Sequence, residues 1–177
     1  MPAADEFLEA AETLANAQQL GHFRRAISTA YYAAFHCVVE ASVDVLFASQ
    51  IARDESRRWF EHGAMADVAQ AVRDSPTHPG KLDAWIATGA AGLGLTSEPS
   101  PEFRKFGEDM RGLYDQRQLA DYFSAPALTL GKGDALRSVA NARRVCSQVG
   151  QWATSRDVVF ERVALAMLSR SVRAKKR

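Results

Sequence analysis

The chain has 177 residues, of which 47% are hydrophobic and 24% charged, and its formal net charge is +1. This composition is typical of a globular protein of one domain, and the near-neutral balance excludes a global field that attracts nucleic acid, membranes or acidic substrates. No run approaches the roughly 18–20 apolar residues that span a bilayer, and no basic region followed by an apolar one opens the chain, so we expect no signal peptide, no membrane contact and a cytoplasmic location.

The chain has two cysteines, Cys37 and Cys146. Neither belongs to a C-x-x-C pair or to a Cys/His cluster with metal-ligand spacing, so we expect no metal site and no cofactor. Cys37 lies within an apolar helical run and is expected to be a small core residue, a usage that fits a reducing cytoplasm.

Apolar residues three and four apart predict a first helix over residues 4–19, ending before Gly21. A second helix, over residues 22–48, contains no Gly or Pro, and its apolar stripe approaches a heptad pattern. Its many alanines let a neighbouring helix approach closely, which is typical of the core helix of a bundle. The same helix is long enough to form a homodimer interface as well.

A third helix is predicted over residues 51–72, bent near Gly63, with Trp59 and Met65 in the core. Residues 73–101 are rich in Pro and Gly, and this is long for a connection inside a domain, which is typical of a functional or mobile loop. A short helix over residues 81–87 is expected to interrupt the loop.

Three further helices are predicted over residues 101–123, 131–154 and 156–176, the last ending in a basic tail. No segment alternates apolar and polar residues, so the fold class is all-α, an antiparallel helical bundle. The tail is expected to be a solvated helix end, or alternatively a contact for RNA or an acidic partner.

Polar residues are densest over residues 115–122, in the helix predicted at 101–123. Arg117 and Asp121 are four residues apart, so they share one side of that helix. An exposed pair at this spacing is worth about 0.3–0.5 kcal/mol and has no functional meaning. The alternative is that Arg117 contacts a phosphate.

Three segments together resemble the HEPN superfamily of RNA-associated proteins, and more narrowly its small stand-alone members. They are the A-Y-Y-A-A-F-H segment at 30–36, the E-H-G segment at 61–63 and the R-Q-L-A-D-Y segment at 117–122. The resemblance covers about residues 4–152 of a single domain over 1–177. The insertion at 73–101 and a C-terminal extension at 155–177 lie outside the pattern of the shortest members.

The resemblance implies a helical bundle of HEPN type that is often dimeric. In active members, paired helices of two protomers build a metal-independent ribonuclease site from an Arg followed by four to six residues and then a His. Histidine exchanges protons near neutral pH, and arginine holds phosphate with two parallel hydrogen bonds.

This chain departs from that signature because Tyr122 stands where the His is expected. Tyrosine, with a pKa of about 10, is a poor general base at pH 7. The resemblance therefore supports Arg117 as a phosphate contact, oriented by Asp121. It leaves open whether Arg117, Asp121 and Tyr122 form a catalytic site. Tyr122 is alternatively a packed tyrosine, or, by analogy with some HEPN toxins, a residue adenylylated by a nucleotidyltransferase antitoxin.

Other residues are expected to assist. Arg24 and Arg25 begin a helix in solvent or, with Arg117, form a basic patch that binds RNA phosphates. His36 and His62 are either partly buried structural histidines or supporting residues of the site. The same motifs carry two further supporting candidates, Tyr31 and Tyr32.

Three functions stay open. The first is an RNA-associated or partner-binding HEPN protein, expected from the resemblance to be a homodimer, that works with a minimal nucleotidyltransferase in a two-component toxin–antitoxin-like or defence system. The second is a metal-independent endoribonuclease toxin acting through Arg117. The third is a helical scaffold without catalysis.

Overall fold

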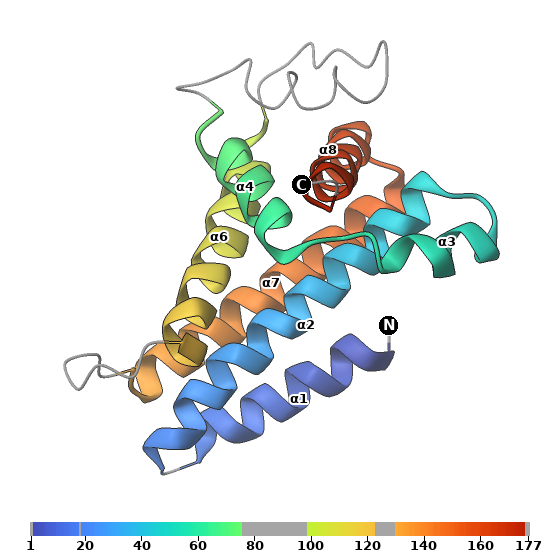
Figure 1. The fold of residues 1–177 in the computed structure, drawn as a ribbon. Helices are drawn as coiled ribbons and strands as arrows, with labels where there is room; N and C mark the ends of the chain where they lie inside the picture. The colour runs from blue at the N-terminus through green and yellow to red at the C-terminus, as the bar shows by residue number, and fades with distance from the viewer. Residues whose placement is uncertain (1, 18, 76–98, 123–129, 176–177) are drawn as a thin grey trace.

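The structure is a computed structural model that describes residues 2–17, 19–75, 99–122 and 130–175, and these residues form helices and no strands, as predicted. Figure 1 shows the helices in chain order: α1 (Pro2–Asn16), α2 (Leu20–Leu46), α3 (Gln50–Arg57), α4 (His62–Arg73), α6 (Pro101–Tyr122), α7 (Lys132–Ser155) and α8 (Val158–Ala174). The predicted helix at 81–87 and most of the loop at 73–101 lie outside the described residues.

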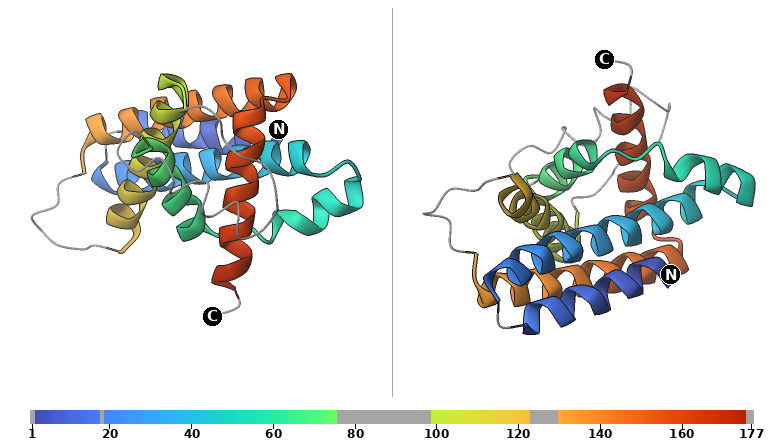
Figure 2. Two further views of the ribbon diagram at one scale, coloured as in Figure 1. Left: turned by 90° about the horizontal axis from the view of Figure 1, so that it is seen from above. Right: turned by 60° about the horizontal axis from the view of Figure 1, so that its bottom comes forward.

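The long helix α2 is the centre of the bundle. It contacts α1 and α7 on one side and α6 and α8 on the other, and α4 packs against both α6 and α8 (Figures 1 and 2). Because α2 is covered on both sides, most of its apolar side chains are buried, as expected of a core helix.

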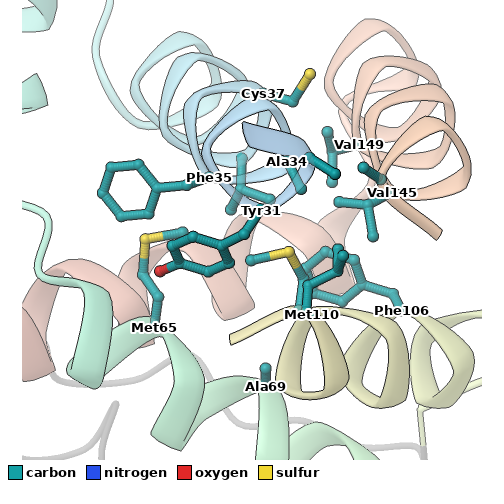
Figure 3. Packing of buried hydrophobic residues seen from close by; sticks show 14 of the residues in the cluster. Tyr31, Ala34, Phe35, Cys37, Met65, Ala69, Phe106, Met110, Val145 and Val149 are labelled. Carbon is teal, nitrogen blue, oxygen red and sulfur yellow. The ribbon is translucent and has the colours of Figure 1, made fainter. Parts of the chain in front are cut away.

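The alanines of α2 are the reason for this close packing. Ala26, Ala30 and Ala34 are completely buried, so the backbones of neighbouring helices approach α2 closely. Between these small residues, the Tyr31 ring reaches from α2 towards Met65 of α4 and towards Met110 of α6 (Figure 3). Burying a large apolar side chain stabilises the fold by about 1.5–3 kcal/mol, so this layer holds α4 and α6 against α2.

Residues 51–72 form two helices instead of the single predicted one. The break lies at 58–61, ending two residues before the predicted bend at Gly63, and within it Phe60 leaves the helical path to enter the core, where it is 6% exposed. The backbone N–H of Glu61 donates to Ser171 Oγ of α8 at 3.0 Å, which anchors the connection. Trp59 was predicted in the core, but it is 38% exposed.

Helices α4 and α6 are in backbone contact at Gly107. A Cβ atom built there would lie 2.5 Å from the Ala69 carbonyl oxygen and 2.8 Å from the Arg73 nitrogen. Only glycine allows this approach, which holds the end of α4 against the first turns of α6.

Helix α8 extends the core beyond the part that resembles the HEPN pattern. Its Phe160 and Met167 are fully buried. Its basic end is not wholly free in solvent, because Arg170 Nη2 lies 3.1 Å from Asp67 Oδ2 of α4 and Lys175 Nζ lies 3.7 Å from Glu61 Oε1. The last two residues of the basic tail lie outside the described residues.

Cys37 of α2 and Cys146 of α7 form a disulfide, with their Cα atoms 5.3 Å apart. Cys37 is buried, as predicted, but the pairing was not predicted from the sequence. The two cysteines are separated by 109 residues, and only the packing of α2 against α7 brings them together. Among the described helices, none is both long and apolar enough to cross a lipid bilayer.

Candidate functional site

Three helices bring polar and aromatic side chains together where the start of α4 and the end of α6 meet α2. All four tyrosines of the chain gather here, linked by ring contacts and by their closeness to Arg117. We call the group the Arg117 cluster, and its members are Ser28, Tyr31, Tyr32, His62, Tyr114, Arg117, Asp121 and Tyr122. The three motif segments, which are far apart in the sequence, thus converge.

Arg117 is the centre of the cluster and is only 8% exposed. Its Nη2 donates to Tyr32 Oη at 2.8 Å and to Tyr122 Oη at 3.3 Å. Its guanidinium carbon lies 5.4 Å from the ring centre of Tyr32 and 5.2 Å from that of Tyr122. Aromatic faces attract cations at such distances, so the tyrosines compensate part of the cost of burying the charge.

Asp121 contributes the negative charge of the cluster. Its Oδ2 lies 2.8 Å from Arg117 Nε. This contact is ionic rather than a directed hydrogen bond, because Nε is buried and its N–H does not point at an acceptor among the described residues. The other carboxylate oxygen, Oδ1, accepts from Ser28 Oγ at 2.8 Å. Each oxygen of Asp121 therefore has its own partner.

The pair Arg117–Asp121 is not the exposed helix salt bridge of the simplest interpretation. Its side chains are 10% and 24% exposed, whereas those of the pair Arg111–Asp115, at the same spacing on α6, are 26% and 49% exposed. Burial acts to lower the pKa of Arg117, but the hydrogen bond to Tyr32 and the charges around it hold that pKa above its ordinary value. Arg117 is therefore cationic at every physiological pH.

Arg24 was predicted to begin a helix in solvent or to contact phosphate, but its Nε and Nη2 face the end of α6. Its Nε and Nη2 donate to the Ala120 carbonyl oxygen at 2.9 and 2.7 Å, and Nη2 also lies 3.4 Å from the Leu119 carbonyl oxygen. The last carbonyls of a helix lack partners within the helix, so a cation at this end is stabilising. Arg25, its neighbour, is exposed on α2.

Tyr31 and His62 form a hydrogen-bonded pair next to Arg117, with Tyr31 Oη 2.7 Å from His62 Nδ1. Burial raises the pKa of Tyr31, so its phenol stays protonated. Burial, and after it the charge of Arg117, lowers the pKa of His62. A neutral imidazole with its proton on Nε2 leaves Nδ1 to accept from Tyr31, so a protonated phenol and a neutral His62 are compatible with this contact.

His36 lies apart from this pair. Its ring stacks on Phe7 of α1 with centres 5.4 Å apart, and it meets the edge of Phe35 at 5.6 Å. Burial lowers the pKa of His36 as well. These contacts place it at the packing of α1 against α2, where it is a structural residue rather than a member of the cluster.

Ser28 and Tyr114 were not predicted as members of the site. Ser28 carries a signal that is visible only in retrospect: Arg24, Ser28 and Tyr32 are four residues apart on α2, and each contacts the last two turns of α6. Nothing in the sequence shows that α2 and α6 are neighbours in this register.

The chemistry that the cluster offers is a buried cation, several phenol hydroxyls and one neutral imidazole. In the described parts of the chain, no three His, Cys, Asp or Glu side chains form a group able to hold a metal ion. Comparisons with protein-family models, with curated proteins and with solved structures found no match to this chain.

Proposed function

We propose that this chain is a HEPN-type, RNA-associated protein in which Arg117 contacts an RNA phosphate. We further propose that it acts as a homodimer with a minimal nucleotidyltransferase in a two-component toxin–antitoxin-like system. The proposal is supported by the convergence of the three motif segments at one place, since a chance likeness of helical sequence gives no reason for their side chains to meet.

The observation that carries the proposal is the environment of Arg117 Nη2, which donates to two phenol oxygens and not to a carboxylate. A phenol that accepts a hydrogen bond keeps its own proton to donate. Tyr32 and Tyr122 thus offer two O–H donors beside one cation, a set that suits the oxygens of a phosphate. Tyr122 is 66% exposed, so this set reaches the surface.

Fluorescence anisotropy with a labelled RNA oligonucleotide at low salt tests the phosphate contact. We expect Arg117→Gln to weaken RNA binding about tenfold. The slope of the logarithm of the binding constant against the logarithm of salt concentration should fall by about one, which corresponds to one released counter-ion. Arg111→Gln is the matched control, because Arg111 lies on the same helix and also pairs with an Asp four residues later. A folded Arg117→Gln protein that binds RNA like the wild type contradicts the proposal.

The partner requires a separate measurement. Co-expression with the product of the neighbouring gene, followed by affinity purification and sizing, should give a stable complex if that product is a nucleotidyltransferase of the minimal kind. If the protein binds RNA but forms no such complex, the proposed RNA contact stands and the proposed two-component system is wrong. No binding of either kind leaves a helical scaffold.

Metal-independent RNA cleavage is the second candidate, and the position of His62 favours it. In this candidate, His62 of α4 would take the part of the imidazole that position 122 lacks. Its ring lies 5.7 Å from that of Tyr32, the hydrogen-bond partner of Arg117. Induced expression with RNA integrity as readout tests this candidate. Cleavage in the presence of a chelator that is lost in both Arg117→Ala and His62→Gln supports it, whereas intact RNA and normal growth with the wild type exclude it.

A further inference from the structure

The two oxygens of the Asp121 carboxylate are held by different helices. Oδ2 lies 2.8 Å from Arg117 Nε of its own helix, and Oδ1 accepts from Ser28 of α2 at 2.8 Å. Arg24 fixes the adjoining carbonyl of Ala120 at 2.7 Å. The carboxylate is thus held against Arg117 by side chains of α2 and not only by helix spacing.

We propose that Asp121 is an internal anion that occupies Arg117 in the free protein, and that Ser28 is the positioning residue that holds it there. An RNA phosphate then reaches the full charge of Arg117 only by displacing Asp121. This inference rests on the proposed phosphate contact, and it adds the regulation of that contact.

Electrostatics is the reason for displacement. A phosphate within hydrogen-bond distance of Arg117 lies close to the Asp121 carboxylate, and two like charges at that distance repel strongly in a partly buried site. The Asp121 side chain is 24% exposed, so it has a path to solvent. Tyr122, whose Oη accepts from Arg117 Nη2, has no carboxylate to repel the phosphate and can stay in place.

The test measures RNA and phosphate binding of Asp121→Asn, which keeps the shape and a Ser28 contact but removes the charge. We expect affinity for the labelled RNA to rise about fivefold at low salt, and inorganic phosphate to raise the melting temperature of the variant more than that of the wild type. The melting temperature without ligand should fall, because Arg117 loses its counter-ion. A purely structural role predicts the loss of stability without the gain in affinity.

Asp115→Asn is the matched control, since it makes the same charge change six residues earlier, beside Arg111. It should leave both affinities within about twofold of the wild type. Ser28→Ala is the second variant: it keeps every charge, and by releasing Asp121 it should strengthen RNA binding by a smaller factor. The gain in Asp121→Asn should vanish when Arg117→Gln is added.

Unchanged affinity in both Asp121→Asn and Ser28→Ala overturns the inference. If Arg117→Gln still weakens RNA binding in that case, the proposed phosphate contact stands and only its internal competitor is wrong. If neither the wild type nor Asp121→Asn binds RNA or phosphate, the proposed contact fails, and the inference fails with it.

Discussion

Tyr31 and His62 meet across two helices through a 2.7 Å contact between a phenol oxygen and Nδ1 of an imidazole. Tyr31 is 1% exposed, so its hydroxyl depends on this partner rather than on water. The His62 ring in turn packs at 4.0 Å on that of Phe35. The pair therefore fixes the start of α4 against α2, and the guanidinium carbon of Arg117 lies 5.8 Å from the ring centre of Tyr31.

Tyr31→Phe should destabilise the fold by about 1–2 kcal/mol, because the variant keeps the buried ring but leaves Nδ1 of His62 without its donor. Urea denaturation followed by circular dichroism measures the change. Tyr122→Phe is the control, since the Tyr122 ring is largely in solvent, and its stability should be near that of the wild type. Equal losses in the two variants contradict the assignment of a buried, hydrogen-bonded role to Tyr31.

The two half-buried histidines predict a pH dependence of stability. Burial lowers the pKa of His36 and, together with the charge of Arg117, that of His62. The unfolded chain then binds protons more readily than the folded one, so the free energy of unfolding rises with pH between the lowered pKa values and the unfolded value of about 6.5. Stability is complete above this window and is lost as the pH falls through it.

Urea midpoints at about pH 7.5 and about pH 5.5 measure this dependence. The wild type should be less stable at the lower pH, and His62→Gln should lose less on acidification than the wild type does. Titration of the His62 ring by NMR should give a midpoint below the ordinary histidine value. A midpoint above it means that the fold favours the charged imidazole, which contradicts the lowered pKa of His62.

Gly107→Ala should be strongly destabilising, by more than about 2 kcal/mol, because the new methyl group meets backbone atoms of α4 that cannot move without separating the helices. Gly112→Ala on the same helix is the matched control. A Cβ there has no atom within 4 Å among the neighbours, so the change should be neutral or stabilising by up to about 1 kcal/mol. The melting temperature of Gly107→Ala should therefore fall while that of Gly112→Ala stays level or rises. Equal shifts of the two melting temperatures contradict the backbone contact.

Asp109→Asn should cost about 2 kcal/mol of stability. The Asp109 side chain is 2% exposed, and its two oxygens lie 2.6 Å from Arg144 Nε of α7 and 3.2 Å from Lys105 Nζ. Arg144 and Lys105 are partly in solvent, so water can stabilise their charges when the carboxylate is gone, and this reduces the loss of stability. Asp115→Asn, in an exposed pair, should change stability by less than about 0.5 kcal/mol. If both variants unfold at the same urea concentration, the buried carboxylate does not stabilise the packing of α6 on α7.

Reduction of the disulfide should lower the free energy of unfolding by about 2–4 kcal/mol, because a cross-link that closes a long loop restricts the unfolded chain. Urea curves with and without reductant measure this difference, and peptide mapping without reductant checks that Cys37 is joined to Cys146. The variant with both cysteines replaced by Ala should match the reduced wild type and be insensitive to reductant. A reductant effect that persists in this variant shows that the loss has another origin.

Much of the helical order is predictable from the sequence because it depends on local signals. The uninterrupted apolar stripe of α2 and the Pro101 that begins α6 place those helices within a few residues. The break before α4 is not predictable in this way, because Phe60 leaves the helix to join the buried core of the whole fold. The prediction that Trp59 lies in the core was wrong for the same reason. It assumed that the helical spacing of apolar residues continues through residues 58–61, which are not helical in the structure.

The candidate site was predictable only in part. The spacing of Arg117 and Asp121 shows that they share a side of α6, and the motif indicates that Tyr122 belongs with them. That Arg24 faces carbonyl groups, and that Ser28 holds Asp121, depends on how α2 and α6 align, which no local pattern contains. The disulfide is another such case, because it follows from the neighbourhood of α2 and α7.

Arg24, Ser28 and Tyr32 are spaced four residues apart. Because of this spacing, we expect this part of α2 to tolerate substitutions better than insertions or deletions. A substitution at one of the three removes the contacts of that residue with α6 and leaves those of the other two in place. Inserting or deleting one residue between Arg24 and Tyr32 turns the two ends of α2 by about 100° relative to each other, so the contacts at both ends cannot be kept together. Relatives of this chain should therefore vary in residue identity along this stretch of α2 far more freely than in its length, and gaps in their alignment should collect elsewhere.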